Sequence, residues 1–499
     1  MTTVYFRKGL VLVLICSFIG TGFVPIISGN YNFDDPPEID WDKTYGGPDL
    51  DFAWCVQQIN DGGYIIAGGT NSYGAGDRDL WLVKTDSNGN KLWDKTFGGA
   101  DYEEASCVQQ INNGGYIITG GTNSYGSGNT DVWLVKTDSN GTKLWDKTFG
   151  GTGYDIAYSV TQTNDDGYIL TGETYSYGSG NTDLWLIKTD SNGSKLWDKT
   201  FGGIGYDRAY CVQQTNDDGY ILTGTTDSYG AGAWDLWLVK TDSNGNKLWD
   251  KTFGGSSHDG AECVQQTNDG GYILTGRTFS YGSGNGDFWL VKTDSSGSKL
   301  WDKTFGGADY EEALCVQQTN NGGYILAGTT ESYGAGNGDF WLVKTDSSGN
   351  KLWDKTFGGG SIDFASCVQQ TNDGGYIITG FTDSYGAGDG DFWLVKLSSD
   401  ENIIIEIHGG FRLSAAITNT GSEALADVPW SIDLDGGLIL VGDHSEGVIS
   451  DLGPGAATTI RQSSLYGIGN TVITATVGDA TKQATGFVLG PLVLGIEEI

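Results

Sequence analysis

Residues 93–144 read WDKTFGGADYEEASCVQQINNGGYIITGGTNSYGSGNTDVWLVKTDSNGTKL. This 52-residue unit recurs without insertion or deletion, and the last copy stops short of its end. Its opening tetrapeptide, Trp-Asp-Lys-Thr, begins at Trp41, Trp93, Trp145, Trp197, Trp249, Trp301 and Trp353. A fixed period of this size indicates a solenoid, a propeller or an array of repeats. The repeat therefore decides the fold.

Each unit predicts four short strands joined in series. In the copy quoted above they are Ala105–Ile111, Tyr116–Thr122, Asp131–Thr137 and Lys143–Phe149. Asn-Gly or Asp-Gly dipeptides form tight turns after the first strand, which is typical of β-hairpins. A longer Gly-rich loop follows the second strand, and no Pro occurs from residue 49 to residue 428, which suits hydrogen-bonded sheet. Four-stranded units repeated radially are propeller blades, so the sequence predicts an all-β, seven-bladed β-propeller over residues 31–400.

The ends of the array predict how the ring closes. The fourth strand of the unit first occurs at Ile39–Tyr45, before any complete blade, and the last copy ends after its third strand. Ile39–Tyr45 can therefore complete the seventh blade and remove the open edges of the ring. The segment Ile403–Ile407 competes for the same position.

The turn between the third and fourth strands carries a family resemblance. Residues 85–93 read TDSNGNKLW, and most copies repeat this word. It resembles the Asp…Gly…Trp repeat of pyrroloquinoline-quinone-type propellers, with one residue fewer between Asp and Trp. The resemblance implies the propeller fold and Trp packing between blades. It does not imply the quinone cofactor, and no cofactor is expected from the sequence.

The tail, residues 401–499, lacks the repeat. Four stretches alternate as strands do: Arg412–Thr418, Trp430–Leu434, Ala457–Arg461 and Thr471–Val477. Turns fall at Asn419-Thr420-Gly421 and Leu452-Gly453-Pro454-Gly455. This pattern resembles the cell-adhesion-related (CARDB-like) Ig-like domains, which implies a small β-sandwich. The apolar end of the chain, residues 486–499, reads as a last strand.

The composition excludes one class of partner. The net charge is −35, yet charged residues make up only 18% of the chain, against about 25% in typical domains. The acidity thus comes from scarce Lys and Arg. Because duplex binding requires clustered Lys and Arg, nucleic acid is not an expected partner.

The N-terminus predicts export. Arg7 and Lys8 precede an uncharged run from Gly9 to Ile27, which is typical of a signal peptide over residues 1–30. The run is also close to the roughly 20 residues that span a bilayer, so an uncleaved N-terminal anchor is the alternative. Both alternatives predict an extracellular or cell-surface protein. Membrane contact is expected only through such an uncleaved segment.

Six of the seven cysteines occupy one repeat position. They are Cys55, Cys107, Cys211, Cys263, Cys315 and Cys367, and Ser159 stands there in the third copy. Equivalent sites in separate repeats rarely pair, so small buried thiols are expected in preference to disulfides. No CxxC spacing supports a structural zinc site.

Chain direction sorts the loops onto two faces, and the longer loops share one of them. Loops of this kind carry function more often than tight turns. Two sets of side chains recur on that face. A carboxylate recurs in the loop that joins the fourth strand of one blade to the first strand of the next, which we call the four–one loop. These residues are Asp51, Glu103, Asp155, Asp207, Asp259, Glu311 and Asp363. A tyrosine recurs in the loop between the second and third strands, which we call the two–three loop. These residues are Tyr73, Tyr125, Tyr177, Tyr229, Tyr281, Tyr333 and Tyr385.

For each of these two sets there is a ligand-binding hypothesis and an alternative in which the side chains are purely structural. The carboxylates are expected to ring the channel mouth, where their oxygens are hard ligands that suit calcium. The tyrosine faces suit stacking on sugars. Alternatively, each acid accepts backbone N–H groups of its own loops, and each tyrosine packs between blades.

Catalysis has little support in the sequence. The chain has three His, and none has a neighbouring His or Cys that suggests a triad or a metal trio. Arg208 and His258 break the sevenfold symmetry and are added to the candidate ligand-binding residues.

We therefore expect a non-enzymatic, exported adhesion or binding module, multivalent for an extracellular glycan or protein. The alternatives are a polysaccharide hydrolase or lyase with its site at the channel mouth, and a purely structural envelope component. The symmetry of the site distinguishes these functions. A multivalent binder can use all seven blades alike, whereas an enzyme concentrates its function at the few blades that differ from the others.

Overall fold

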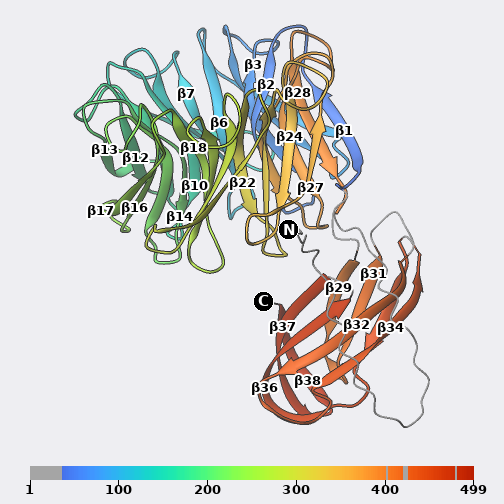
Figure 1. Ribbon diagram of the computed structural model, residues 1–499. Coiled ribbons are helices and arrows are strands. Elements are labelled where there is room, and N and C mark those ends of the chain that lie inside the picture. Colours follow the sequence, from blue (N-terminus) through green and yellow to red (C-terminus); the bar gives the residue numbers. More distant parts are fainter. Residues whose placement is uncertain (1–35, 400–402, 420–424, 454, 478–479, 499) are drawn as a thin grey trace, which may run out of the picture. The chain divides into compact units, whose positions relative to one another are not determined.

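The computed structural model describes residues 36–399, 403–419, 425–453, 455–477 and 480–498. These residues form strands and no helix, which confirms the all-β prediction. Seven four-stranded sheets form a seven-bladed propeller, and a region of further strands follows it (Figure 1). The predicted export signal, residues 1–30, lies outside the described residues. Within the described part of the chain, no helix could cross a membrane.

Each blade is an antiparallel meander of four strands. The first strands are β2 (Asp51–Gln58), β6 (Glu103–Gln110), β10 (Asp155–Gln162), β14 (Asp207–Gln214), β18 (Asp259–Gln266), β22 (Glu311–Gln318) and β26 (Asp363–Gln370). The second strands are β3 (Tyr64–Thr70), β7 (Tyr116–Thr122), β11 (Tyr168–Thr174), β15 (Tyr220–Thr226), β19 (Tyr272–Thr278), β23 (Tyr324–Thr330) and β27 (Tyr376–Thr382). The first strand begins two residues earlier than predicted, so the recurring acid is its first residue.

The third and fourth strands complete the blades. The third strands are β4 (Asp79–Thr85), β8 (Asp131–Thr137), β12 (Asp183–Thr189), β16 (Asp235–Thr241), β20 (Asp287–Thr293), β24 (Asp339–Thr345) and β28 (Asp391–Leu397). The fourth strands are β5 (Lys91–Phe97), β9 (Lys143–Phe149), β13 (Lys195–Phe201), β17 (Lys247–Phe253), β21 (Lys299–Phe305) and β25 (Lys351–Phe357). The first strands of neighbouring blades contact one another around the ring, so they line the central channel.

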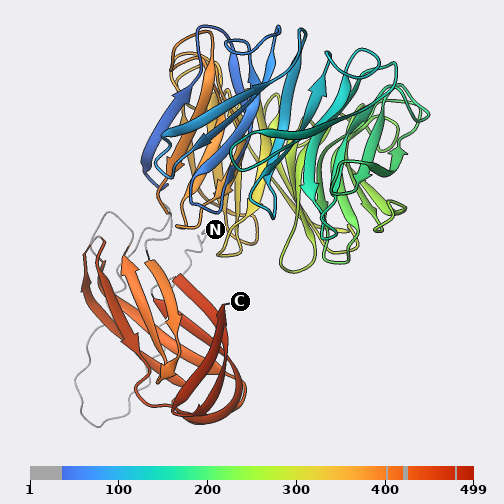
Figure 2. The ribbon, with the colours of Figure 1, turned by 180° about the vertical axis from the view of Figure 1, so that it is seen from behind.

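The seventh blade takes its fourth strand from the other end of the propeller. β1 (Ile39–Tyr45) pairs antiparallel with β28, with Asp42 opposite Val395 and Tyr45 opposite Phe392. Figures 1 and 2 show β1 in blue beside the orange β28. The competing segment lies in β29 (Ile403–His408), which pairs with β31 (Ser414–Asn419) of the tail. The N-terminal strand therefore closes the ring.

Every blade boundary repeats one Trp contact. The Trp93 ring of β5 lies 6.0 Å from the Tyr116 ring of the next blade. Gly141 of that blade has a φ of +76°, and a Cβ there would lie 2.8 Å from atoms of the Trp93 ring. Glycine is thus required twice at this turn, for its backbone conformation and for the space that the indole fills. This contact is the Trp packing between blades that the resemblance implied.

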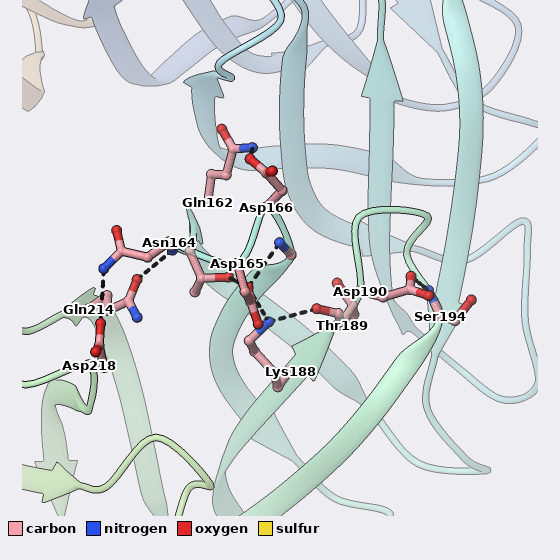
Figure 3. A network of polar contacts seen from close by, with 12 residues as sticks. Gln162, Asn164, Asp165, Asp166, Lys188, Thr189, Asp190, Ser194, Gln214 and Asp218 are labelled. Carbon is pink, nitrogen blue, oxygen red and sulfur yellow. Dashed lines mark hydrogen bonds and ion pairs between the residues drawn. The ribbon is translucent and has the colours of Figure 1, made fainter.

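The tight turns on the other face connect neighbouring blades through polar side chains (Figure 3). The Lys188 side chain is buried, and its ammonium donates to Asp165 Oδ1 and to the Thr189 carbonyl, both at 2.9 Å. Asn164 reaches the next blade, since its N–H donates to Gln214 Oε1 at 2.9 Å and its side chain to Asp218 at 3.0 Å. In five blades the burial of this lysine is therefore compensated by an aspartate in the turn of its own blade.

The tail forms two sheets. One holds β29, β31 and β35 (Ala457–Arg461). The other holds β30 (Gly410–Phe411), β38 (Leu492–Glu498), β37 (Ala480–Gly490), β36 (Tyr466–Val477), β32 (Leu425–Asp435) and β34 (His444–Leu452), with β33 (Leu438–Val441) beside β36. Ile417 of the first sheet and Ile432 and Ile473 of the second are buried. All four predicted strands occur, but the predicted last strand is the end of β37 together with β38.

Removing β1 tests ring closure. A chain that begins at residue 46 leaves β28 as an unpaired edge and deprives the Trp393 indole of the Asp42 carboxylate that it contacts at 3.1 Å. We expect a lower melting temperature and self-association, because open edges pair with other chains. Differential scanning calorimetry and light scattering are compared with a control chain that begins at residue 36. Equal melting temperatures and monomer content would refute closure by β1.

The Lys–Asp turns predict acid sensitivity. Although burial opposes it, hydrogen bonds from Lys292, Thr267 and the Gly271 N–H lower the pKa of Asp269 to about 2. The unfolded chain, with an aspartate pKa of about 3.9, then binds more protons between these values. The stability supplied by this carboxylate is therefore fully present above about pH 4 and is lost as the pH falls toward 2.

The matched variant is Asp269→Asn, because Asn321 occupies the same repeat position and contacts Lys344 at 3.0 Å. The melting temperature of Asp269→Asn should fall less steeply than that of the wild type between pH 4 and 2. The reverse exchange, Asn321→Asp, should steepen the fall. Identical pH profiles of all three proteins would contradict the assignment.

Candidate functional site

The seven recurring acids lie at the long-loop end of the first strands, with side chains that are buried. In every blade one carboxylate oxygen accepts the N–H of the glycine four residues earlier, at 2.6–2.9 Å. Asp155 also accepts hydrogen bonds from the hydroxyls of Thr174 and, at 2.6 Å, Ser176 in the two–three loop. Six of the acids therefore join the two long loops of their blade, whereas Asp51 contacts Gly47 and its buried Oδ1 has no hydrogen-bond partner among the described residues.

The acids begin the first strands that line the channel, yet their carboxylates are buried. Their oxygens turn into the loops because the loop N–H and hydroxyl groups need acceptors once they are buried. No group of three or more His, Cys, Asp or Glu is arranged to hold a metal ion in the described residues. The contacts favour the structural alternative, and calcium binding stays a prediction.

The seven recurring tyrosines lie half-exposed on the rim of the same face. Each hydroxyl donates to the carbonyl of a glycine that follows the fourth strand of the preceding blade, at 2.7–3.0 Å. Each ring packs at 5.2–5.6 Å on the third-strand Trp of its own blade. The tyrosines therefore help to connect the blades. Because their rings are partly exposed, contact with a ligand stays a prediction.

A third set of side chains differs from blade to blade and surrounds the channel on this face. One position of the first strand holds Phe52, Glu104, Ile156, Arg208, Gly260, Glu312 and Phe364. A second holds Trp54, Ser106, Tyr158, Tyr210, Glu262, Leu314 and Ser366. A second-strand position beside them holds Gly69, Gly121, Glu173, Thr225, Arg277, Thr329 and Phe381. We call the region that these positions line the channel mouth.

Backbone geometry presents these side chains to the channel. The pairing of β2 with β3 shifts its register between Ala53 and Cys55, and the same irregularity recurs in every blade. A bulge leaves its extra residue outside the ladder and re-aims its side chain. Trp54 occupies this place, and its side chain is 36% exposed.

A charged network joins the third and fourth blades at the mouth. The buried Glu173 accepts the Tyr158 hydroxyl at 2.7 Å and pairs with Arg208 Nε at 2.6 Å. The rings of Tyr158 and Tyr210 lie 5.1 Å apart. The interaction with Glu173 raises the pKa of Arg208 despite its burial, so its cation is fixed in the network.

Arg78 repeats this arrangement between the first two blades. It donates to the Tyr102 hydroxyl at 2.9 Å and pairs with Glu104 at 3.4 Å. Its guanidinium lies 4.2 Å from the centre of the Phe52 ring, a cation–π distance.

Arg277 does the same between the fifth and sixth blades. It donates to the Tyr310 hydroxyl at 3.0 Å and pairs closely with Glu312. The three arginines of the propeller therefore all lie at the channel mouth, each with a glutamate and a tyrosine.

Glu262 lies between two of these networks. Within the described residues its carboxyl has no hydrogen bond and no ion pair. Burial and the nearby Glu312 carboxylate raise its pKa above its usual range, while Arg277 and Arg208 act against them. The mouth thus holds one carboxyl group that the protein itself does not engage.

Apolar side chains of the first and seventh blades line one side of the channel mouth. A pocket of about 180 Å³ is lined by Leu50, Phe52, Trp54, Phe364 and Phe381, together with Ala53 and Ser366. The rings of Phe52 and Trp54 are 5.4 Å apart, and those of Trp54 and Phe364 are 6.1 Å apart. One side of the mouth is therefore aromatic and the other is charged.

The two symmetry-breaking residues named from the sequence have different places. Arg208 belongs to the mouth network. His258 lies on the rim, where its ring is 6.4 Å from that of Phe279 and its carbonyl accepts the Phe279 N–H. Trp54, Glu173, Glu262 and Arg277 were not predicted as site residues, although aligning the seven copies would have marked the two repeat positions that they occupy as variable.

Comparison with known proteins finds distant similarity to solved structures. No protein-family model and no curated protein matches the chain. Among solved structures, the chain is similar to the Pan2 WD40 domain of Neurospora crassa, with 10% identity over 71% of this chain and 92% of that one, and a TM-score of 0.42. A protein of unknown function from Dyadobacter fermentans is 11% identical over 72% and 99%, with a TM-score of 0.41. A puromycin hydrolase is 10% identical over 74% of this chain and 58% of its own, with a TM-score of 0.43.

The role of the acids is tested by Asp207→Ala. Asp207 accepts hydrogen bonds from the Gly203 N–H and the Ser228 hydroxyl, so the change leaves buried donors unsatisfied. We expect the free energy of unfolding to fall by at least about 1–3 kcal/mol in urea titrations.

Asp207→Glu is the matched control, because Glu103 and Glu311 occupy this position in two blades. It should keep most of the stability. Calcium should not raise the unfolding midpoint of the wild type. A calcium-dependent rise that Asp207→Ala abolishes would instead make the acid a metal ligand.

Proposed function

We propose that this protein is an exported binding module whose channel mouth binds a single glycan chain. The observation that carries the proposal is the convergence of blade-specific side chains on one mouth of an otherwise repeated scaffold. Binding sites are typically concave and lined by aromatic groups, with a few polar groups that fix orientation. The channel mouth has this composition.

The chemistry of the mouth suits a sugar in particular. A pyranose has an apolar face of C–H groups and a rim of hydroxyls. The exposed Trp54 and the adjacent Phe364 offer aromatic faces for the former. The Arg208–Glu173 and Arg277–Glu312 pairs offer fixed donors and acceptors for the latter.

Export and attachment are part of the proposal. The signal-like segment at residues 1–30 supports an extracellular or cell-surface location. The resemblances of the repeat turn to quinone-type propellers and of the tail to cell-adhesion-related Ig-like domains support a surface-bound module, with the tail as a spacer or adhesion domain. A protein ligand with a similar aromatic and polar surface is an outcome that the test below distinguishes.

The sevenfold rim offers a multivalent version of the same function. The seven rim tyrosines are equivalent, so several copies of one ligand could engage them together and gain avidity. The stoichiometry of binding separates this version, with up to seven sites, from one site at the mouth.

Glu262 supports a second candidate, a polysaccharide hydrolase. Its raised pKa keeps its carboxyl protonated at higher pH than usual, as a general acid requires, while Glu173 and Glu312 stay paired with arginines. Glycoside cleavage needs one protonated and one ionised carboxyl group. In this case Glu262→Gln would abolish product release from a bound polysaccharide and leave its binding unchanged.

Glycan-array screening followed by calorimetry of the best oligosaccharide tests the proposal. We expect about one ligand per chain. Trp54→Ala should weaken binding at least about tenfold, or about 1.4 kcal/mol. Arg208→Gln should weaken it similarly, because it leaves Glu173 without its cation.

Tyr281→Phe is the rim control and should bind like the wild type. A stoichiometry near seven with full binding by Trp54→Ala would favour the multivalent rim and overturn the mouth. Binding of proteins but no glycan would overturn the choice of ligand.

A further inference from the structure

Below the channel mouth, six cysteine side chains line the channel. They occupy the middle of the first strands, which are the innermost strands of the blades. All six are free thiols and only partly buried. The expectation of thiols in preference to disulfides therefore holds for these six residues, which are partly and not fully buried.

Each thiol bridges toward the next blade. The six Sγ atoms lie 3.5–3.7 Å from the carbonyl oxygen of the valine that follows the next blade's equivalent residue. Cys55 thus reaches Val108, the neighbour of Cys107, and Cys367 reaches Val56, the neighbour of Cys55. In the third blade the Ser159 hydroxyl accepts the Val212 N–H at 3.3 Å instead.

The thiols form one continuous arc. Its order around the channel is Cys211, Cys263, Cys315, Cys367, Cys55 and Cys107, with Ser159 between the two ends. Neighbouring thiols lie close together, because in five places the Sγ atom is 3.5–3.7 Å from the carbonyl oxygen of the residue that follows the next cysteine. Interactions with neighbouring thiols, together with burial, raise the pKa values of Cys55 and Cys315 well above the usual value.

The geometry restricts which metal ions such an arc can take. Thiolates are soft ligands that select Cu(I), zinc and iron–sulfur clusters. Structural zinc needs four ligands in a tetrahedron, whereas the described residues hold no group of three or more metal-ligating side chains arranged around one point. A linear, two-coordinate ion needs only two sulfurs, one from each of two neighbouring blades.

We propose that the thiol arc binds soft monovalent ions of the Cu(I) and Ag(I) class, each held between the Sγ atoms of two neighbouring blades. Each ion forms two metal–sulfur bonds and displaces one proton from each thiol, without a change of oxidation state. Six thiols taken in pairs hold at most three ions. The thiols are partly exposed on the innermost strands, and this site does not depend on the glycan proposal.

Anaerobic titration of the reduced full chain with Cu(I), against bicinchoninate as competitor, tests this site. Every protein in the series carries Cys16→Ser, which removes the thiol outside the arc. We expect about three ions per chain and an ultraviolet band from thiolate-to-copper charge transfer. Cys315→Ser should reduce the capacity to about two ions, because it leaves two adjacent pairs and one unpaired thiol.

The control replaces all six arc cysteines with serine, which the fold already accepts at Ser159. This variant should melt near the wild-type temperature and bind no Cu(I) against the competitor. Undiminished Cu(I) binding by the six-serine variant, or no binding by the reduced parent, would overturn the proposal. Zinc binding tighter than Cu(I) binding would overturn the two-coordinate geometry.

Discussion

Each blade of this protein buries both faces of its sheet against its neighbours, and the rest of the structure depends on that constraint. The second and third strands are almost wholly buried, and the apolar clusters run across blade boundaries, as where Ile65 and Leu82 pack with Tyr116 and Val135. A single blade would expose both faces to water, so stability exists only in the closed ring. The Trp–Gly contact recurs at six blade boundaries and the loop acid in all seven blades, because each boundary needs the same contacts. The Lys–Asp pair recurs within five blades.

A scaffold so strictly repeated leaves few places where side chains can differ. Those places are the ends of the inner strands, where a residue faces the channel and not another blade. The three arginines of the propeller lie around this mouth, and so do the glutamates that pair with them. Function in this fold is therefore expected where the repeat is broken, and the aromatic and charged groups of the mouth would give the proposed ligand one defined orientation.

The sequence predicted the architecture well and the site only in part. The period and the hairpin turns specify the blade, and the surplus strand at Ile39–Tyr45 specifies ring closure, because both are local patterns. Arg208 was found through its asymmetry. The recurring acids and tyrosines were named as site candidates because they recur, whereas the structure shows that side chains repeated in every blade hold the loops. The contact of Trp54 with Phe364 joins opposite ends of the propeller sequence, so no local pattern could reveal it.

The pairing of β1 with β28 also constrains how the chain folds. β1 is the first propeller strand to be made, and its partner is the last, so the ring cannot close until every blade exists. Contacts between such distant residues slow folding. Moreover, Trp-Asp-Lys-Thr of β1 is repeated in all the other fourth strands, so β1 fits the third strand of any earlier blade nearly as well. Kinetic competition from smaller, prematurely closed rings is thus built into the repeat, and folding each blade before β1 docks is the route that avoids it.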